Sequence, residues 1–327
     1  MNLLVTGGAG FIGSCFVRHI LNTYPDYRVI NLDALTYCGN LDNLKDVENN
    51  PNYRFVHGNI CDRRLVRELT GQVDCVINFA AESHVDNSIK RPEIFVETNI
   101  QGTLNLLQAS KETGIKRFLQ VSTDEVYGTL GKTGYFYETT PLAPNSPYSA
   151  SKAGADLLVR AYGETYKLPV LITRCSNNYG PYQYTEKLIP FFISRLLKGE
   201  RVPVYGDGLN VRDWLYVYDH CRAIDVVLHR GQAGEVYNIG GHNEKTNIEI
   251  TRLILEKMGK DETCIEYVQD RPGHDRRYAI SNDKITSQLG WKPSVTFEEG
   301  ISMTIDWYLN NQDWIKNLER KKEAALV

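Results

Sequence analysis

The sequence predicts an α/β protein, with a doubly wound parallel sheet and a smaller α/β lobe on its C-terminal side. The chain opens with an uncharged apolar run at residues 1–6 that leads directly into a glycine-rich turn. Short apolar stretches then alternate with helix-like stretches as far as about residue 175. Beyond that point the alternation becomes irregular, and Asn, Pro, Gly and Tyr are concentrated. Such alternation is typical of parallel strands with helices on both faces.

The expected elements follow one another regularly. Strands are predicted at residues 1–6, 28–33, 74–81, 117–122 and 170–174. Helices are predicted at residues 14–23, 93–113 and 149–166. The first strand is apolar and uncharged, as expected of a strand buried on both faces. The helix at 93–113 has apolar residues at helical spacing and is followed by Gly114, a frequent helix terminator.

These elements suggest two units. Residues 1–175 form the expected nucleotide-binding domain, with residues 214–240 returning to it. Residues 176–213 and 241–327 form the expected substrate-binding lobe. Open α/β sheets bind ligands at the carboxyl ends of their strands, and the lobe would cover that edge. The charged tail at 316–323 is predicted as a solvated, partly frayed helix.

The turn after the first strand predicts a dinucleotide site. Gly8, Gly10 and Gly13 satisfy the pattern G-x-G-x-x-G, and Gly7 adds a fourth glycine. Glycines at this spacing permit a tight turn and a close approach of backbone to a pyrophosphate. The following helix would direct its positive end at the phosphates. The pattern is weak alone, but here it stands between a strand and a helix, which is the context it requires.

Asp33 ends the second predicted strand, twenty residues past Gly13. An acidic side chain at this distance bonds the adenosine ribose hydroxyls. The next residues are Ala34 and Leu35, so no arginine follows that would accommodate a 2′-phosphate. The sequence therefore favours NAD over NADP.

Tyr148 and Lys152 lie four positions apart at the start of a predicted helix. Helical geometry places them on one face, so the ammonium is expected beneath the phenol. The ammonium favours the phenolate, and a phenol of reference pKa ~10 then acts as a base near neutral pH. Alcohol oxidation needs such a base while hydride leaves the same carbon. The spacing also occurs by chance on exposed helices, so this prediction depends on the nucleotide pattern upstream.

Thr123, Asp124 and Glu125 follow the predicted strand at 117–122. Thr123 is placed to bond the oxygen that Tyr148 deprotonates. Two adjacent acids suggest a further step, because close carboxylates separate their pKa values into one acid and one base. Both acids reach one substrate only if the strand has already ended there, since successive strand residues point to opposite faces. The alternative is that one acid caps a helix or joins an ion pair.

Composition excludes several classes of protein. The chain of 327 residues has a formal net charge of -3, so it offers no basic field for nucleic acid. No apolar run approaches the ~18 residues of a membrane span, and we see no signal peptide. The seven cysteines form no CxxC pair, so we expect reduced thiols, no metal site and a cytoplasmic location.

Ten segments give the chain a resemblance to the extended short-chain dehydrogenases/reductases, and within them to the dTDP-glucose 4,6-dehydratases. The segments are TGGAGFIG (6–13), LTYCGNL (35–41), NFAAESHVD (78–86), STDEVYG (122–128), SPYSASK (146–152), CSNNYGPYQ (175–183), EKLIP (186–190), RDWLYVYDH (212–220), YNIGGHNE (237–244) and RPGHDRRYAI (271–280). They span nearly the whole chain. Related epimerases carry small or hydroxyl residues where Asp124 and Glu125 stand.

The resemblance implies a Rossmann domain and a complete reaction cycle. Tyr148, helped by Lys152 and Thr123, would deprotonate the glucose 4-hydroxyl while hydride leaves C4. Glu125 would remove the C5 proton, and Asp124 would protonate the departing C6 hydroxyl. Hydride would then return to C6, leaving a 4-keto-6-deoxy sugar nucleotide and NAD in its oxidised form.

The resemblance also implies two sets of binding residues. The NAD set is Gly7, Gly10, Phe11, Ile12, Gly13, Asp33, Asn59, Ile60, Ala80, Ala81, Ser83, Thr98, Tyr148, Lys152 and Asn178. The substrate set is Ser83, His84, Thr123, Asn177, Lys187, Leu188, Pro203, Val204, Tyr205, Arg212, Asn238, Arg271 and His274. Within these sets, Lys187 and Arg212 suit a diphosphate. The family usually has Asp at Asn59, but an amide oxygen still accepts from adenine.

Other functions remain open at this point. One alternative is a 4-epimerase, or a 4,6-dehydratase acting on another nucleotide sugar. Another is an NAD-binding protein of the same fold without catalysis, although such a protein has no need of the five catalytic residues. The resemblance further implies a homodimer built through a four-helix bundle of residues 93–113 and 149–166 from each subunit. The sequence alone would also allow those faces to lie within one core.

Overall fold

The computed structural model describes residues 1–270 and 274–324. Its centre is a seven-stranded sheet in which all neighbouring strands are parallel. In order across the sheet, the strands are β10 (Val236–Ile239), β6 (Val170–Cys175), β5 (Arg117–Thr123), β4 (Cys75–Asn78), β1 (Asn2–Thr6), β2 (Arg28–Asp33) and β3 (Tyr53–His57). This confirms the predicted doubly wound sheet. Strand order reverses between β1 and β4, which is where such sheets bind ligands.

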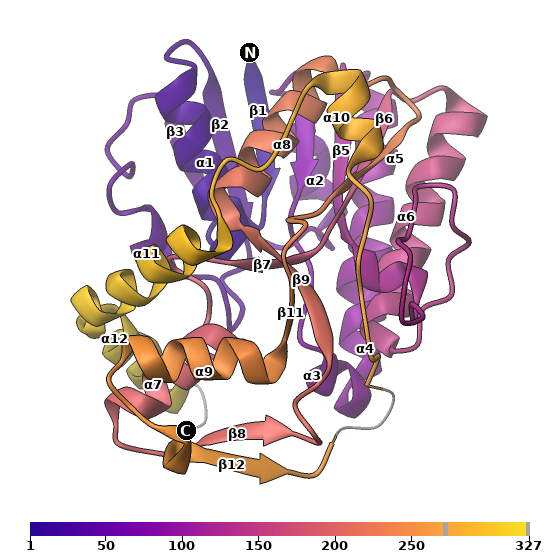
Figure 1. The fold of residues 1–327 in the computed structure, drawn as a ribbon. Coiled ribbons are helices and arrows are strands. Elements are labelled where there is room, and N and C mark those ends of the chain that lie inside the picture. The colour runs from indigo at the N-terminus through magenta and orange to yellow at the C-terminus, as the bar shows by residue number, and fades with distance from the viewer. Residues whose placement is uncertain (271–273, 325–327) are drawn as a thin grey trace.

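Two helical layers cover the sheet (Figure 1). α1 (Phe11–Thr23) and α8 (Val217–Arg230) lie on one face, and α2 (Arg63–Thr70), α5 (Thr103–Thr113) and α6 (Pro147–Tyr166) lie on the other. The alternation of β1 fits both layers, because Leu3 and Val5 join the core beneath α1 and α8, whereas Leu4 joins the opposite core. α10 (Asp283–Leu289) packs on the first core through Ile285 and Leu289.

A smaller lobe lies beyond the carboxyl ends of the strands (Figure 1). Its core is rich in aromatic residues, including Tyr179, Trp214 and Tyr308. It contains a two-stranded parallel sheet, a three-stranded sheet and four helices among the described residues. These elements are β8 (Val202–Tyr205) with β12 (Ile265–Val268), β7 (Asn177–Tyr179) with β9 (Val211–Tyr216) and β11 (Glu244–Thr246), and α7 (Leu188–Leu197), α9 (Asn247–Lys257), α11 (Phe297–Asn310) and α12 (Gln312–Ala324).

α12 is better anchored than the predicted frayed tail. Trp314 and Leu318 are buried in the lobe core, and the Trp314 indole donates to Asn43 Oδ1 at 3.0 Å. The Lys321 ammonium also lies 3.1 Å from a carboxylate oxygen of Asp42. Apolar residues at helical spacing lie between the charged residues of the tail. They form one face of the helix, which packs against the core of the smaller lobe.

The predicted helix at 93–113 is helical throughout but not α-helical throughout. It consists of α4 (Pro92–Phe95), a π-helical segment η2 (Val96–Gly102) and α5. Within η2, Asn99 accepts from the Glu82 amide at 2.9 Å and donates to Ser151 Oγ at 2.8 Å. These bonds hold the wide turn against both α6 and the loop after β4. The spacing of apolar residues does not reveal the extra residue in a π-helical turn. Such turns are frequently found at functional sites.

Short elements complete the chain. They are α3 (Val85–Lys90) and the 3₁₀ turns η1 (Leu41–Leu44), η3 (Asp124–Tyr127) and η4 (Glu262–Cys264). Across residues 1–270 and 274–324, no helix is both long and apolar enough to cross a membrane.

Candidate active site

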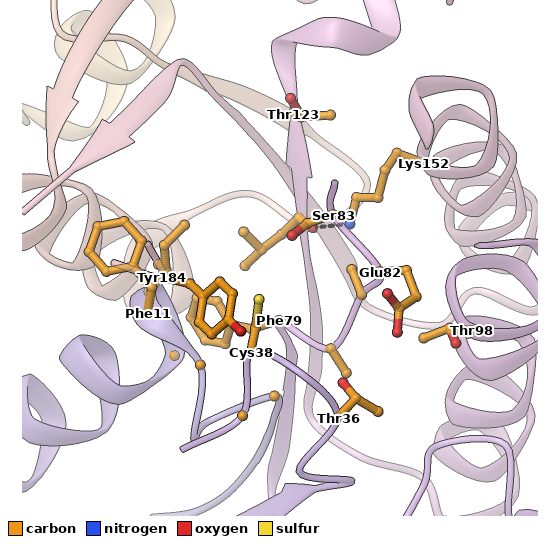
Figure 2. Close-up of a pocket in the computed structure, with 18 of the residues that line it drawn as sticks. Phe11, Thr36, Cys38, Phe79, Glu82, Ser83, Thr98, Thr123, Lys152 and Tyr184 are labelled. Atoms are coloured by element: carbon orange, nitrogen blue, oxygen red, sulfur yellow. Dashed lines mark hydrogen bonds between the residues drawn. The ribbon is translucent and has the colours of Figure 1, made fainter. Parts of the chain in front are cut away.

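A cavity of about 310 Å³ lies at the carboxyl ends of the central strands. Its walls come from the β1–α1 turn, the residues after β2, β4, β5 and β6, the start of α6, and residues 183–187 of the smaller lobe. Figure 2 shows Lys152 reaching from α6 and Thr123 at the end of β5, with Phe11, Cys38 and Tyr184 on another side. The cavity therefore joins the predicted nucleotide pattern to the predicted catalytic residues.

The glycine turn forms a cradle whose backbone is packed too closely for a side chain at Gly7 or Gly13. Gly7 has φ +71°, and a Cβ there would lie 2.6 Å from the Ala80 backbone nitrogen. A Cβ on Gly13 would lie 2.3 Å from the Gly7 carbonyl oxygen. The turn leads directly into α1, whose first amides have no partner within the helix. This arrangement fits a pyrophosphate at the helix N-terminus.

Asp33 lies beside the glycine turn, at the end of β2. One carboxylate oxygen accepts from the Ala9 amide and the other from the Leu35 amide, both at 2.8 Å. Burial raises the pKa of Asp33, and these backbone hydrogen bonds lower it. The carboxylate is thus fixed in place and keeps lone pairs for ribose hydroxyls. Together with the cradle, it fits a dinucleotide.

All fifteen residues predicted for NAD line this cavity. They are Gly7, Gly10, Phe11, Ile12, Gly13, Asp33, Asn59, Ile60, Ala80, Ala81, Ser83, Thr98, Tyr148, Lys152 and Asn178. The Asn178 side chain also donates to Ser176 O and shares a 2.9 Å hydrogen bond with buried His220. Burial lowers the pKa of His220 to about 3. The imidazole is therefore neutral near pH 7, and in that form it holds the Asn178 side chain.

Tyr148 and Lys152 share one face of α6, which begins with a capping box at Ser146. The Lys152 ammonium donates to the Val121 carbonyl oxygen at 2.7 Å. Burial raises the pKa of Tyr148 well above its usual value, as does the charge of Glu125, whereas a hydrogen bond with Thr123 lowers it. The net direction is opposite to the predicted lowering of the phenol pKa, and burial is its largest cause. A low phenol pKa needs additional positive charge at the site.

Asp124 and Glu125 occupy different environments. β5 ends at Thr123 and η3 starts at Asp124, so the strand has ended where the two acids begin. Glu125 lines the cavity, but Asp124 lies behind it with only 2 % of its surface exposed. Burial raises the pKa of Asp124 well above its usual value, and the charges of Glu125 and Asp213 raise it further. Burial therefore favours the protonated form of Asp124, whereas Glu125 is the acid that reaches the cavity.

The predicted substrate residues divide into two groups. Ser83, Asn177 and Lys187 line the cavity, as does Thr123. The Lys187 ammonium donates to the Ser83 carbonyl oxygen at 3.0 Å, which joins the smaller lobe to the loop after β4. The other predicted substrate residues in the described part of the chain lie outside the cavity wall, namely His84, Leu188, Pro203, Val204, Tyr205, Arg212, Asn238 and His274. Arg271 lies outside the described residues.

Several residues of this second group already have structural partners. The Arg212 guanidinium donates to the carbonyl oxygens of Val211 and Asp275, and it lies 4.4 Å from the centre of the Tyr278 ring. Val204 is buried in the core of the smaller lobe. His274 shares a 2.6 Å hydrogen bond with Asp270. Asn238 is fully buried in a polar network beneath the site.

Sequence reasoning missed part of the cavity wall. The additional lining residues with polar or aromatic side chains include Thr36, Cys38, Glu82, Gln183 and Tyr184. Thr36 and Cys38 follow β2, and Glu82 follows β4. The rule that ligands meet the carboxyl ends of strands could have identified them. Gln183 and Tyr184 come from the smaller lobe, and no local pattern indicates their position.

Four neighbouring side chains, two of which line the cavity, form an inter-lobe strap, which consists of Tyr37, Cys38, Tyr184 and Glu186. The Tyr37 hydroxyl donates to Glu186 Oε1 at 3.1 Å, and the Cys38 thiol lies 3.9 Å from the same oxygen. The Tyr37 ring also meets the Tyr184 ring edge-on, with 5.6 Å between their centres. Cys38 and Tyr184 line the cavity, so the strap crosses beside the nucleotide cradle.

Comparison with known proteins gives consistent results. The family described as GDP-mannose 4,6 dehydratase matches residues 4–304. A dTDP-glucose 4,6-dehydratase of Xanthomonas campestris pv. campestris is 56% identical, over 96% of this chain and 95% of that protein. The crystal structure of DesIV, a dTDP-glucose 4,6-dehydratase of Streptomyces venezuelae solved with NAD bound, has 53% identity and a TM-score of 0.95. It covers 97% of this chain and 100% of its own.

A more distant relative has a different activity. The UDP-glucose 4-epimerase of Thermotoga maritima has 33% identity and a TM-score of 0.89, and the match covers 95% of this chain and 100% of that one. The fold is therefore common to both activities. The two relatives named above as dTDP-glucose 4,6-dehydratases are 56% and 53% identical to this chain, against 33% for the epimerase.

Proposed function

The chain belongs to the dTDP-glucose 4,6-dehydratase family, and we propose that it converts dTDP-glucose to dTDP-4-keto-6-deoxyglucose and water as an NAD-dependent hydro-lyase. One observation carries this proposal. The oxidation pair, Tyr148 and Lys152, lines one cavity with Thr123 and Glu125 beside a dinucleotide cradle, and Asp124 is the buried residue between Thr123 and Glu125. A simple alcohol oxidation does not need two acids. The elimination of water does, because it requires a base and an acid.

The chain's own residues hold the cofactor and the sugar. Gly10, Gly13 and Asp33 are the proposed holders of the NAD pyrophosphate and adenosine ribose. Bound there, NAD would supply a nicotinamide ring able to take up hydride in its oxidised form and to return it in its reduced form. Lys187 and Arg212 are the proposed cations for the substrate diphosphate. We assign the large sheet to the cofactor and the smaller lobe to the nucleotide of the substrate.

Tyr148 is the proposed base for the 4-hydroxyl. Its hydrogen bond with Thr123 brings a second hydroxyl to the same sugar oxygen. Positive charge at the nicotinamide end of the site would oppose the burial that raises the pKa of Tyr148. Lys152 is itself held by the Val121 carbonyl oxygen, so its ammonium has a fixed position, and its backbone lies about one helical turn from Tyr148.

Glu125 and Asp124 are the proposed base and acid of the elimination. A ketone at C4 acidifies the C5 proton, which Glu125 would remove from the cavity side. Asp124 would protonate the departing C6 hydroxyl. Its Oδ2 atom is buried without a hydrogen-bond partner among the described residues. A protonated carboxyl in that position has a proton to donate, provided the substrate supplies the acceptor.

The acid role of Asp124 predicts a pH dependence. Burial and the charges of Glu125 and Asp213 raise its pKa, so the carboxyl keeps its proton at low pH and loses it as pH rises through that raised pKa. We expect the rate of water loss to fall on the alkaline side. Asp124→Asn should be slower by roughly 100-fold and should lack this fall. Rapid-quench mass spectrometry across pH measures both. An unchanged alkaline fall in Asp124→Asn would remove Asp124 from this role.

The inter-lobe strap predicts slow release of NAD. The reaction regenerates oxidised NAD, so the cofactor has no need to leave between turnovers. Tyr37→Phe removes the hydrogen bond to Glu186 and keeps the ring contact with Tyr184. We expect NAD to dissociate roughly tenfold faster, the value of one hydrogen bond to a charged group. Stopped-flow exchange with a fluorescent NAD analogue measures the rate. Tyr267→Phe, an exposed change on β12, is the control, and equal rates in the two variants would contradict the prediction.

Direct assay tests the function itself. Purified protein is incubated separately with dTDP-glucose, UDP-glucose, GDP-mannose and CDP-glucose, and the products are read by mass spectrometry. We expect the loss of one water with dTDP-glucose alone. Water loss with another nucleotide would correct the base preference. An unchanged mass with all four would contradict the proposal, and NMR of the sugars would then identify epimerisation or no reaction.

We also propose that the protein is a cytoplasmic homodimer. Ile89 on α3, Val96 on η2 and Leu157 on α6 are apolar side chains that are 47%, 53% and 57% exposed. Val96 and Leu157 lie within the residue ranges predicted for the four-helix bundle, and Ile89 lies just before the first of them. A second copy would cover these side chains. The seven free thiols suit a reducing compartment. Light scattering of the purified protein measures the mass in solution, and a monomer would contradict the dimer.

A further inference from the structure

The two proposed half-reactions use residues on two different elements. Tyr148 and Lys152 belong to α6, whereas Asp124 and Glu125 belong to η3, a single turn after β5. A sugar bound in one pose must meet both sets. The placement of η3 relative to α6 therefore matters for the elimination, because small displacements of reacting groups reduce rates strongly.

A buried ion pair lies beneath α6. Asp156 is one helical turn after Lys152, and its Oδ2 atom accepts from Arg174 Nε at 2.9 Å. The two side chains are 1% and 6% exposed. Arg174 comes from β6, where it lies opposite Ser122 of β5. Burial lowers the pKa of Lys152 and the charge of Asp156 raises it, so Asp156 also favours the charged lysine.

The same arginine reaches η3. Arg174 Nη1 donates to the Tyr127 hydroxyl at 2.9 Å, and the guanidinium carbon lies 4.9 Å from the centre of the Tyr127 ring. Tyr127 is the last residue of η3. Its hydroxyl donates in turn to Asn238 Oδ1 at 2.8 Å. The Tyr127 ring stacks on Phe136, with 5.1 Å between centres. The far end of the catalytic turn is thereby fixed.

We propose that Arg174 and Tyr127 are positioning residues, which hold the Asp124–Glu125 turn in register with the Tyr148–Lys152 helix so that oxidation and elimination act on one sugar pose. This inference rests on the proposed function. Arg174 joins the two elements because its planar fork presents separate donors to Asp156 and Tyr127. A lysine at this position would carry the same charge, but it would lack the planar group that presents donors in two directions. Neither Arg174 nor Tyr127 lines the cavity, so they act through the residues that do.

The ratio between the rate of C4 oxidation and the rate of water loss tests this proposal. Tyr127→Phe keeps the ring on Phe136 and removes only the hydroxyl between Arg174 and Asn238. We expect water loss to slow by roughly 10- to 100-fold, and C4 oxidation to change by less than about twofold. The oxidised but undehydrated sugar nucleotide should then accumulate. Rapid-quench mass spectrometry gives the fraction of intermediate, and exchange of the C5 proton with deuterated solvent gives the proton-removal step.

Tyr162→Phe is the matched control. Tyr162 lies on α6 and donates to Gln108 on α5 at 3.1 Å, so this variant also loses one buried tyrosine hydrogen bond, but none that leads to η3. Its fraction of intermediate should equal that of the unmodified protein. A merely structural role for Tyr127 would slow both steps together and leave that fraction unchanged, which would overturn the proposal.

Arg174→Lys is a second variant, which tests the proposal if Tyr127→Phe does not fold. Arg174→Lys keeps a positive charge beside Asp156 and loses the bond to Tyr127, so it should show the same accumulation of intermediate. If Tyr127→Phe does not fold, this variant decides the question by the same ratio. Failure of the proposed function is separate, because the unmodified protein would then release no water from dTDP-glucose.

Discussion

Tyr148→Phe is expected to abolish turnover while leaving NAD binding intact. The change removes the only atom proposed to take the proton of the sugar 4-hydroxyl, and it keeps the ring in its buried position. General-base catalysis contributes about 10²–10⁴-fold, and without C4 oxidation no later step begins. We expect a loss of roughly 10³-fold or more in product formation. Neither reduced nicotinamide nor dehydrated product should form in a single turnover with saturating dTDP-glucose.

The control for Tyr148→Phe lies on the same helix. Tyr166→Phe changes an exposed tyrosine at the far end of α6 and should keep normal turnover. Isothermal titration with NAD shows whether the Tyr148→Phe site remains formed. Activity within tenfold of the unmodified protein would remove Tyr148 from the role of base. Another group, such as Thr123, would then have to take the proton.

Glu125→Gln is expected to separate the two halves of the reaction. Glutamine has nearly the shape of glutamate but cannot remove the C5 proton, so water loss should fall by roughly 10²–10⁴-fold. Oxidation at C4 should persist, and the reduced nicotinamide absorbance should rise and remain. The negative charge of Glu125 also raises the pKa of Tyr148. Its removal should lower that pKa, so oxidation should begin at lower pH than in the unmodified protein.

Stopped-flow absorbance and rapid-quench mass spectrometry measure these two effects. Glu164→Gln, an exposed change on α6, is the control for the altered charge. Equal loss of oxidation and water loss in Glu125→Gln would contradict the assigned role. An upward shift of the pH at which oxidation begins would contradict the electrostatic argument on its own.

The parts of the site set by local backbone rules were predictable. The glycine cradle and Asp33 lie where the spacing from Gly7 to Asp33 indicated, because a strand–turn–helix unit fixes their positions within one short segment. Tyr148 and Lys152 share a helical face for the same reason. Each of these predictions depended only on residues that are close in sequence.

The remaining features depend on tertiary contacts. The hydrogen bond between Tyr37 and Glu186 joins residues 149 positions apart, and no local pattern indicates it. The π-helical turn at Asn99 depends on partners in the loop after β4 and in α6. The raised pKa of Tyr148 comes from burial, which a pair of residues four apart cannot reveal. The sequence indicated only that Arg174 belongs to a strand. In the structure its side chain bonds to both α6 and η3.

The central claim is that a single hydride leaves C4 and returns to C6 of the same sugar. dTDP-glucose carrying deuterium at C4 tests it most directly, with NMR and mass spectrometry of the product after one turnover. We expect deuterium at C6 of a 4-keto-6-deoxy sugar, with one solvent proton gained at C5. Deuterium that remains at C4, or that is lost to solvent while water is eliminated, would contradict it.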